Sequence, residues 1–315
     1  MNARTILIHT SLLLLTFLTM AFAGVAWLNK NPLELTNFVY GLPYAVLLTV
    51  MLLSHEMGHY LAARHHGVAA TLPYFLPFPS FILGLFPFGT LGAVIQLRSP
   101  VRSRKALLDI GAAGPISGFI VSVAYLVIGF STLPSIDFLY SIHPEYVGLS
   151  QIPTEGLTFG RNLIYSGLEA VIPSSADFIP PMNELYHYPF LCVGWFGLLI
   201  TAMNLLPVGQ LDGGHIVRAM FGGVSVLIGR IVMGILAVLG ILGFAPLFGW
   251  SDEWGWTGWL FWAIVLFFMF ERRRRAPLPL PDDAPLDQAR VMVGWLCLWM
   301  FVVGFSIAPF TIRLG

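Results

Sequence analysis

Three residues whose side chains can bind a metal or transfer a proton, His55, Glu56 and His59, lie in an otherwise apolar part of the chain. Residues four apart project from the same face of a helix, so the imidazoles of His55 and His59 can bind one metal ion. Glu56 lies about 100° further round the helix, where its carboxylate can act as a general base toward water at the metal. This spacing predicts a zinc hydrolase. The alternative is a pair of core histidines satisfied by ordinary hydrogen bonds.

The composition places this pattern in a membrane protein. Of the 315 residues, 57% are hydrophobic and 10% are charged, whereas soluble domains carry about 25% charged residues. The mean hydropathy is +0.80. Ionisable side chains inside a membrane are costly and therefore usually functional. The net charge is zero and indicates no partner by itself. The lipid bilayer is the expected surrounding, and nucleic acid is not an expected partner.

Seven apolar segments are candidates to cross a bilayer, which takes about 20 apolar residues as a helix. The expected spans are 5–28, 40–63, 106–131, 188–207, 224–248, 257–271 and 291–311. The first is interpreted as a signal anchor, because it shows no clear cleavage site. We therefore expect an all-α polytopic membrane protein in which residues 1–315 form a single membrane-embedded domain.

The basic residues between these spans predict an orientation. With a cytoplasmic N-terminus and alternating spans, only Lys30, Arg161 and Arg313 fall on the non-cytoplasmic side, which leaves thirteen of the 16 Lys and Arg residues in the cytoplasm. This asymmetry follows the positive-inside rule. We expect a multi-pass protein of the bacterial inner (plasma) membrane. The motif then lies within the membrane, with His55 about 12 Å from the cytoplasmic end of its helix.

Residues 71–97 form an unusual apolar segment. They contain several prolines and glycines, which disfavour a continuous helix, and both flanks are basic. A re-entrant segment explains both features, with a strand over 90–97 inside a protein-lined cavity. The alternative is an ordinary surface loop with an apolar composition.

Two further segments lie outside the expected spans. Residues 132–187 are the long non-cytoplasmic loop, and no separate activity is assigned to them. The loop histidines His143 and His187, like His9, lie in no recognisable motif and are interpreted as ordinary. Residues 272–290 are expected to form a cytoplasmic linker that begins with four arginines and continues as a proline-rich stretch.

A catalytic zinc site typically has three protein ligands, so a third must come from another segment. The best candidate is Asp212, a carboxylate in apolar surroundings between the fourth and fifth spans, in a stretch that is broken by Pro207, Gly209, Gly213 and Gly214. His215 is a rival ligand three residues later. A role for Asp212 as a helix cap is the structural alternative.

These residues carry a family resemblance. The sequence resembles the site-2 proteases, the intramembrane zinc metalloproteases, in two motifs, whose matching residues are His55, Glu56, His59, Asn204, Pro207, Leu211, Asp212 and Gly213. A third similar element is Gly111–Gly118, whose small residues permit close helix packing. The resemblance covers the catalytic core of that family, at about 40–131 and 188–221 here. The chain has no room for PDZ or CBS domains, so it resembles the minimal plastid and cyanobacterial branch.

The resemblance implies roles for particular residues. His55, His59 and Asp212 would hold Zn²⁺, and Glu56 would be the general base. Asn204 would position the substrate or stabilise the oxyanion, and His215 would lie behind the ligands. Transmembrane proteins would be the substrates, cut within or near their membrane segments in regulated intramembrane proteolysis. An edge strand within 90–97 could hold an unwound substrate by backbone pairing.

Two other functions remain open. A divalent-cation transporter would carry several ionisable residues along a path, but only Asp109 joins the predicted zinc set. A catalytically silent membrane-protein chaperone would normally lack Glu56, which is present. These patterns imply no particular substrate and no particular oligomeric state.

Overall fold

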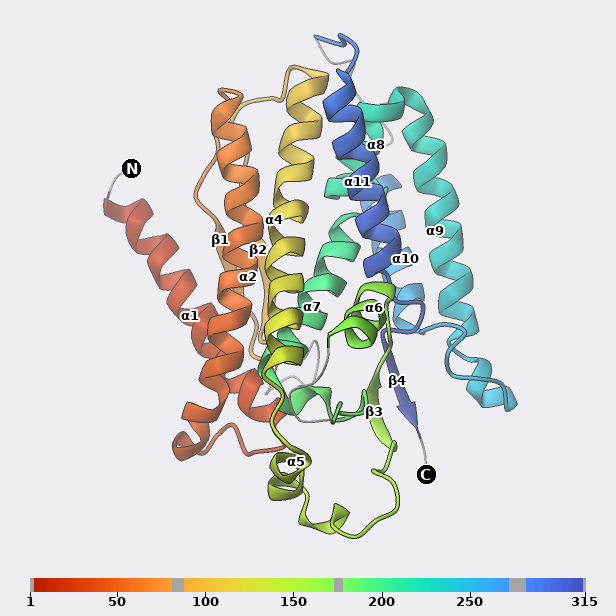
Figure 1. Ribbon diagram of the computed structural model, residues 1–315. Helices are drawn as coiled ribbons and strands as arrows, with labels where there is room; N and C mark the ends of the chain where they lie inside the picture. Colours follow the sequence, from red (N-terminus) through yellow and green to blue (C-terminus); the bar gives the residue numbers. More distant parts are fainter. Residues whose placement is uncertain (1–2, 81–87, 173–177, 272–281, 314–315) are drawn as a thin grey trace.

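The computed structural model describes residues 3–80, 88–172, 178–271 and 282–313. Within these ranges the protein is a bundle of helices with two small antiparallel sheets, each of two strands (Figure 1). Four helical segments are long and apolar enough to cross a membrane, namely Ala3–Trp27, Leu35–His65, Arg104–Ser131 and Asp212–Leu242. Three apolar helices are shorter, namely α7 (Pro189–Asn204), α10 (Gly258–Glu271) and α11 (Gln288–Gly304). The prediction of an all-α polytopic membrane protein is confirmed.

The centre of the bundle is made by α2 (Phe38–His65), α4 (Arg104–Ser131) and α7, which pack closely against one another. Glycines allow this approach. A Cβ at Gly58 of α2 would lie 2.4 Å from the carbonyl oxygen of Ala113 on α4, and one at Gly197 of α7 would lie 2.1 Å from Ser122 Oγ. Small residues at such contacts let helix backbones meet, which is how helices associate in lipid. On one side of this core lies α1 (Ala3–Trp27).

The expected re-entrant segment is a β-hairpin packed beside α1 and α2. Its strands, β1 (Tyr74–Pro77) and β2 (Thr90–Val94), are antiparallel, and residues 81–87 between them lie outside the described residues. An isolated bridge joins Ala70 to Leu97, so the segment enters and leaves at one place. The hydroxyl of Tyr44, in α2, donates to the carbonyl oxygen of Phe88 at 3.2 Å. The strand expected over 90–97 is thus present but shorter.

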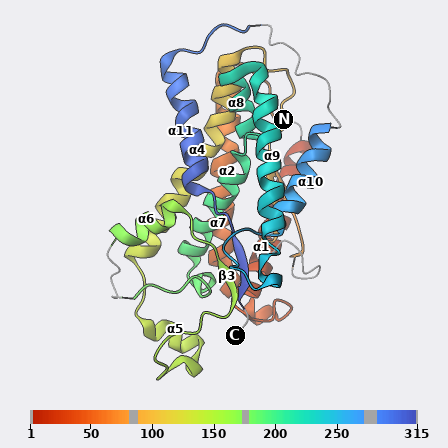
Figure 2. The same cartoon turned by 90° about the vertical axis from the view of Figure 1, so that its right-hand side faces the viewer.

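The long loop 132–187 lies at the end of the bundle away from α8 (Asp212–Phe221), as Figures 1 and 2 both show. Apart from residues 173–177, which the structure does not describe, the loop is built from short elements. These are α5 (Ile136–Ile142), η2 (Pro144–Tyr146), β3 (Gly156–Phe159), α6 (Leu163–Val171) and η3 (Leu185–His187). The side chain of Asn162 caps α6 by accepting from Tyr165 N at 2.9 Å.

The last expected span, 291–311, is wrong at its C-terminal end. Helix α11 stops at Gly304, and Phe310–Arg313 forms strand β4. Strand β4 pairs with β3 of the loop in antiparallel register, with Gly156 opposite Arg313 and Phe159 opposite Phe310. The remaining elements are η1 (Leu35–Asn37) before α2, and η4 (Gly222–Val224), α9 (Ser225–Leu242) and η5 (Ala245–Phe248) after α8.

Most of the expected linker, including its four arginines, falls at 272–281, outside the described residues. Where the described chain resumes, Asp282 is tied to the start of α4. Its backbone N–H donates to the carbonyl oxygen of Arg102 at 3.0 Å, and Arg104 N donates to its carbonyl oxygen at 3.1 Å. The linker therefore returns to the end of the bundle where α2 ends and α4 begins.

Candidate metal centre

The break between α7 and α8 brings the predicted third ligand to the predicted histidine pair. Helix α7 ends at Asn204, Gly209 adopts a positive φ of 58°, and α8 begins at Asp212. A Cβ at Gly213 would lie 1.9 Å from the carbonyl oxygen of Leu205. Only glycine can therefore let the start of α8 fold back so closely onto the end of α7. Pro207 and the glycines of this break, which suggested an inward-turned carboxylate, do form a tight reversal.

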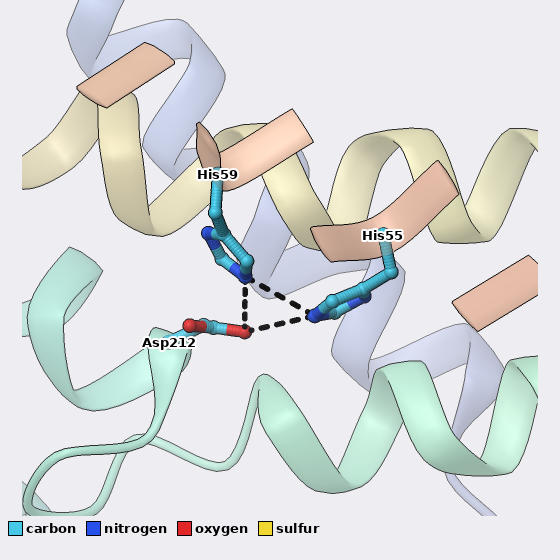
Figure 3. A group of neighbouring side chains, drawn as sticks. All are labelled: His55, His59 and Asp212. Carbon is cyan, nitrogen blue, oxygen red and sulfur yellow. Dashed lines mark hydrogen bonds and ion pairs between the residues drawn. The ribbon is translucent and has the colours of Figure 1, made fainter. Parts of the chain in front are cut away.

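His55, His59 and Asp212 point toward one another, as Figure 3 shows. The Nε2 atoms of the two imidazoles are 3.1 Å apart. Asp212 Oδ2 lies 3.4 Å from His55 Nε2 and 3.3 Å from His59 Nε2. Ligands about 2.0–2.1 Å from a tetrahedral zinc ion lie about 3.3–3.4 Å from one another. The donor types and their spacing therefore both fit zinc.

The surroundings of the imidazoles also suit a metal site. His59 Nδ1 lies 2.7 Å from the carbonyl oxygen of Ile110, to which it can donate its proton, leaving the Nε2 lone pair facing the cluster. Glycines of α4 make room for both rings. A Cβ at Gly114 would lie 2.1 Å from His59 Nε2, and one at Gly118 would lie 3.0 Å from His55 Nδ1. The small-residue face expected on this helix thus packs against the histidines themselves.

The two predicted catalytic residues border this cluster. Glu56 is 7% exposed, and its Oε2 accepts a hydrogen bond from the backbone N–H of Ile95 at 2.9 Å. Ile95 directly follows β2, so the candidate base lies between the ligands and the hairpin. Asn204 Nδ2 lies 3.4 Å from His55 Nε2. His215, the rival ligand, lies outside the group of metal-ligating atoms found in the described part of the chain.

Two contacts were not predicted from the sequence. The bond from Ile95 to Glu56 uses a backbone amide, which any residue but proline could supply. His143 and His187, interpreted as ordinary, meet at Glu184 and form a second group of possible metal ligands. The signal that could have drawn attention to them was the three-residue spacing of Glu184 and His187.

Comparison with known proteins adds independent information. The probable zinc metalloprotease EGY2, chloroplastic, of Oryza sativa subsp. indica is 29% identical over 277 residues, which cover 85% of this chain and 43% of the relative. The probable zinc metalloprotease EGY1, chloroplastic, of Arabidopsis thaliana is 35% identical over 190 residues, which cover 58% of this chain and 30% of the relative. The DDT domain-containing protein PTM of Arabidopsis thaliana is 34% identical over 149 residues, 44% of this chain and 8% of that protein.

The chain thus spans about two fifths of the length of the EGY2 relative. No solved structure matches it significantly. The model of peptidase family M50 matches residues 43–244, a stretch that holds His55, Glu56 and His59 near its start and Asp212 toward its end. On this match, which covers more than half of the sequence, the chain belongs to peptidase family M50.

Proposed function

We propose that this protein is an intramembrane zinc endopeptidase that hydrolyses peptide bonds within or near the transmembrane segments of other membrane proteins. The observation that carries this proposal is the convergence of His55, His59 and Asp212 from two candidate membrane spans, with Glu56 beside them. The names of the EGY relatives, probable zinc metalloproteases, support the metal and the reaction class.

Each residue of the site has a distinct task in this proposal. His55, His59 and Asp212 hold the zinc ion, which when bound acidifies water and polarises a carbonyl group. Glu56 takes the proton from the attacking water and later gives it to the leaving amine. Asn204, whose amide nitrogen faces the cluster, donates a hydrogen bond to the carbonyl oxygen of the substrate as negative charge develops there.

The hairpin supplies a way to present the substrate. A transmembrane helix hides its carbonyl groups in hydrogen bonds, so it must unwind before it can be cut. Strand β2 pairs with β1 in a sheet of two strands, and its side chains Leu91 and Val94 are exposed. An unwound segment that paired with β2 would pass close to Glu56, because the residue after the strand is bonded to that carboxylate.

The same structure disfavours ion transport. Asp109, the ionisable residue that the sequence offered for an ion path, is already paired. Its Oδ2 lies 2.8 Å from His66 Nε2 and 2.7 Å from Arg290 Nη2. Asp109 therefore joins α2, α4 and α11 near the end of the bundle, as a structural contact.

The decisive experiment uses the full-length protein in proteoliposomes with a single-span test protein as substrate. Glu56→Gln removes the base but keeps the size of the side chain, so we expect normal zinc content and a cleavage rate about 10²–10⁴-fold lower. Asp212→Ala should lose both zinc and cleavage. Glu155→Gln, at an exposed loop carboxylate, is the matched control and should behave as wild type. Undiminished cleavage by Glu56→Gln would refute the assignment of the base.

A further inference from the structure

A second group of metal-ligating side chains lies in the loop 132–187, apart from the centre described above. His143 follows α5, Glu184 precedes η3, and His187 ends η3. The Nε2 atoms of the two imidazoles are 3.1 Å apart. Glu184 Oε2 lies 3.3 Å from His187 Nε2 and 3.6 Å from His143 Nε2. These separations resemble those among His55, His59 and Asp212. They lie near the distance of about 3.3–3.4 Å that separates two ligands of a tetrahedral zinc ion.

The carboxylate of this group is buried, so its negative charge needs a cation nearby. Glu184 and His187 are each 2% exposed. Glu184 Oε2 and His187 Nδ1 make no hydrogen bond in the described structure. When the two Nε2 atoms share one proton in the hydrogen bond between them, Glu184 Oε2 receives no proton from either ring, in agreement with its lack of a hydrogen bond. Buried charges are normally paired or bound to metal. A metal ion at the centre would engage both Nε2 atoms and the oxygen together.

Neighbouring side chains hold two of these ligands, His143 and Glu184, in place. His143 Nδ1 lies 2.8 Å from Glu145 Oε1, and the ring stacks on Tyr146 with 4.6 Å between centroids. The other oxygen of Glu184, Oε1, accepts from Tyr146 Oη at 3.1 Å and from Asn183 Nδ2 at 3.0 Å. Oε2 is thereby left facing the imidazoles. A carboxylate behind a ligating histidine, and hydrogen bonds behind a ligating carboxylate, are typical of metal sites.

We propose that His143, Glu184 and His187 form a second zinc site, outside the membrane-spanning part of the protein. Two imidazoles and one carboxylate are ligands that suit zinc, and their spacing suits its tetrahedral geometry. The ion would join the end of α5 to η3, across 44 residues of chain. It would also fix the entry into α7, which begins at Pro189 directly after η3 and ends at Asn204. The site does not depend on the proposed protease activity.

Metal analysis of the full-length protein in detergent tests this proposal. Wild type should bind two equivalents of zinc per chain, and Asp212→Ala should keep one. In the Asp212→Ala background, His143→Ala, Glu184→Gln and His187→Ala should each lose the remaining equivalent. His66→Ala is the matched control, because His66 also contacts a carboxylate, Asp109, but belongs to no group of three ligands among the described residues. It should keep the zinc.

The variants also separate the two sites. Wild type could bind only one equivalent of zinc, and His143→Ala could remove it. That result would support the loop site and contradict the ligand role of Asp212. An Asp212→Ala protein without zinc at micromolar zinc would overturn the loop site. So would zinc that persists in the Asp212→Ala background after both loop histidines are replaced.

A milder variant covers the case in which the ligand variants fail to fold. Glu145 is exposed and its carboxylate contacts His143, so Glu145→Gln should leave the loop folded. In the Asp212→Ala background we expect it to weaken zinc binding about 10–100-fold in a competitive titration. X-ray absorption at the zinc edge should show only nitrogen and oxygen neighbours, with two imidazoles. An unchanged affinity in Glu145→Gln, or sulfur neighbours in the spectrum, would contradict the assignment.

Discussion

At the scale of single residues, the metal centre depends on glycines as much as on its ligands. The imidazoles of His55 and His59 project from α2 toward α4, and they fit because Gly114 and Gly118 carry no side chain there. Ser117, between these glycines, donates to the carbonyl oxygen of Ser54 at 3.0 Å. One face of α4 thus admits the rings and also holds the helix that carries them.

Gly114→Ala should therefore damage the centre although it replaces no ligand. The added methyl group would lie 2.1 Å from His59 Nε2, so the ring must leave its position or the two helices must separate. We expect most of the zinc at this site and the cleavage activity to be lost. Overpacking should also lower the free energy of unfolding by about 1–3 kcal/mol. Zinc content and thermal unfolding in detergent measure these effects.

Gly234→Ala is the control for that substitution. Gly234 lies in α9, and a Cβ there would meet no atom within 4 Å. Replacing glycine inside a helix by alanine normally stabilises it by roughly 0.5–1 kcal/mol. We expect full zinc content and cleavage. Wild-type zinc content in Gly114→Ala would show that the packing of α4 does not determine the site.

The residues of the candidate metal centre, His55, His59 and Asp212, were predictable because the sequence patterns that indicate them are local. The spacing of His55 and His59 places them on one face of a helix. Pro207 and Gly209, before Asp212, indicate that the helix is interrupted there. The loop site was not predictable in the same way. His143 and Glu184 are far apart in sequence, and only the folded loop brings them to within 3.6 Å.

At the scale of elements, the hairpin links the site to its proposed substrate. Strand β2 runs beside α2, and the residue that follows it, Ile95, donates its backbone N–H to Glu56. The strand therefore both displays an edge for pairing and helps to hold the base. Damage to β2 should affect catalysis more than metal binding, because the three ligands come from α2 and α8.

Val94→Pro tests this separation of tasks. Proline at this position removes a backbone N–H and constrains the strand opposite Tyr74. We expect normal zinc content with cleavage of a membrane-spanning substrate at least about tenfold slower, as expected for loss of backbone pairing worth about 1.4 kcal/mol or more. Val94→Ala keeps the backbone and removes only an exposed side chain, so it should cleave nearly as wild type. Equal rates for Val94→Pro and Val94→Ala would exclude the pairing mechanism.

The elements themselves were predictable where hydrophobicity alone defines them. Each of the seven expected spans contains one apolar helix, because long apolar runs have few other structures available in a membrane. The end of the last span was not predictable. Phe310–Arg313 forms a strand only because β3, about 150 residues earlier, lies beside it. Such a pairing leaves no periodic signal in the apolar sequence around it.

At the scale of the whole molecule, the two candidate metal sites occupy different environments. His55, His59 and Asp212 lie inside the helical bundle, whereas His143, Glu184 and His187 lie in the loop at one end of it. The opposite end holds the bridge between Ala70 and Leu97 and the return of the linker at Asp282. Of the described basic residues expected in the cytoplasm, Arg64, Arg104 and Arg290 lie at that opposite end, where α2 ends and α4 and α11 begin, so the orientation of the bundle decides which compartment the loop site faces.

The proposed orientation, with the N-terminus and the linker in the cytoplasm, can be measured with single cysteines. Both native cysteines, Cys192 and Cys297, are free and buried, so replacing them by serine gives a background without reactive thiols. Ser150 in the loop and Asp283 in the linker are exposed. Between them lie α7, the combined α8–α9 segment and α10, which would cross the membrane three times in all. An odd number of crossings puts the two positions on opposite sides.

In intact bacterial cells that express the protein, a membrane-impermeant maleimide should label Ser150→Cys and should label Asp283→Cys only after lysis. The reverse pattern would place the loop site in the cytoplasm, with its metal supplied from there. Labelling of both positions from outside would mean that one of the short helices, α7 or α10, does not cross. If that helix is α7, the chain that carries Asp212 would be anchored only by the span that follows it, Asp212–Leu242, and the packing of the bundle would have to hold Asp212 at the site.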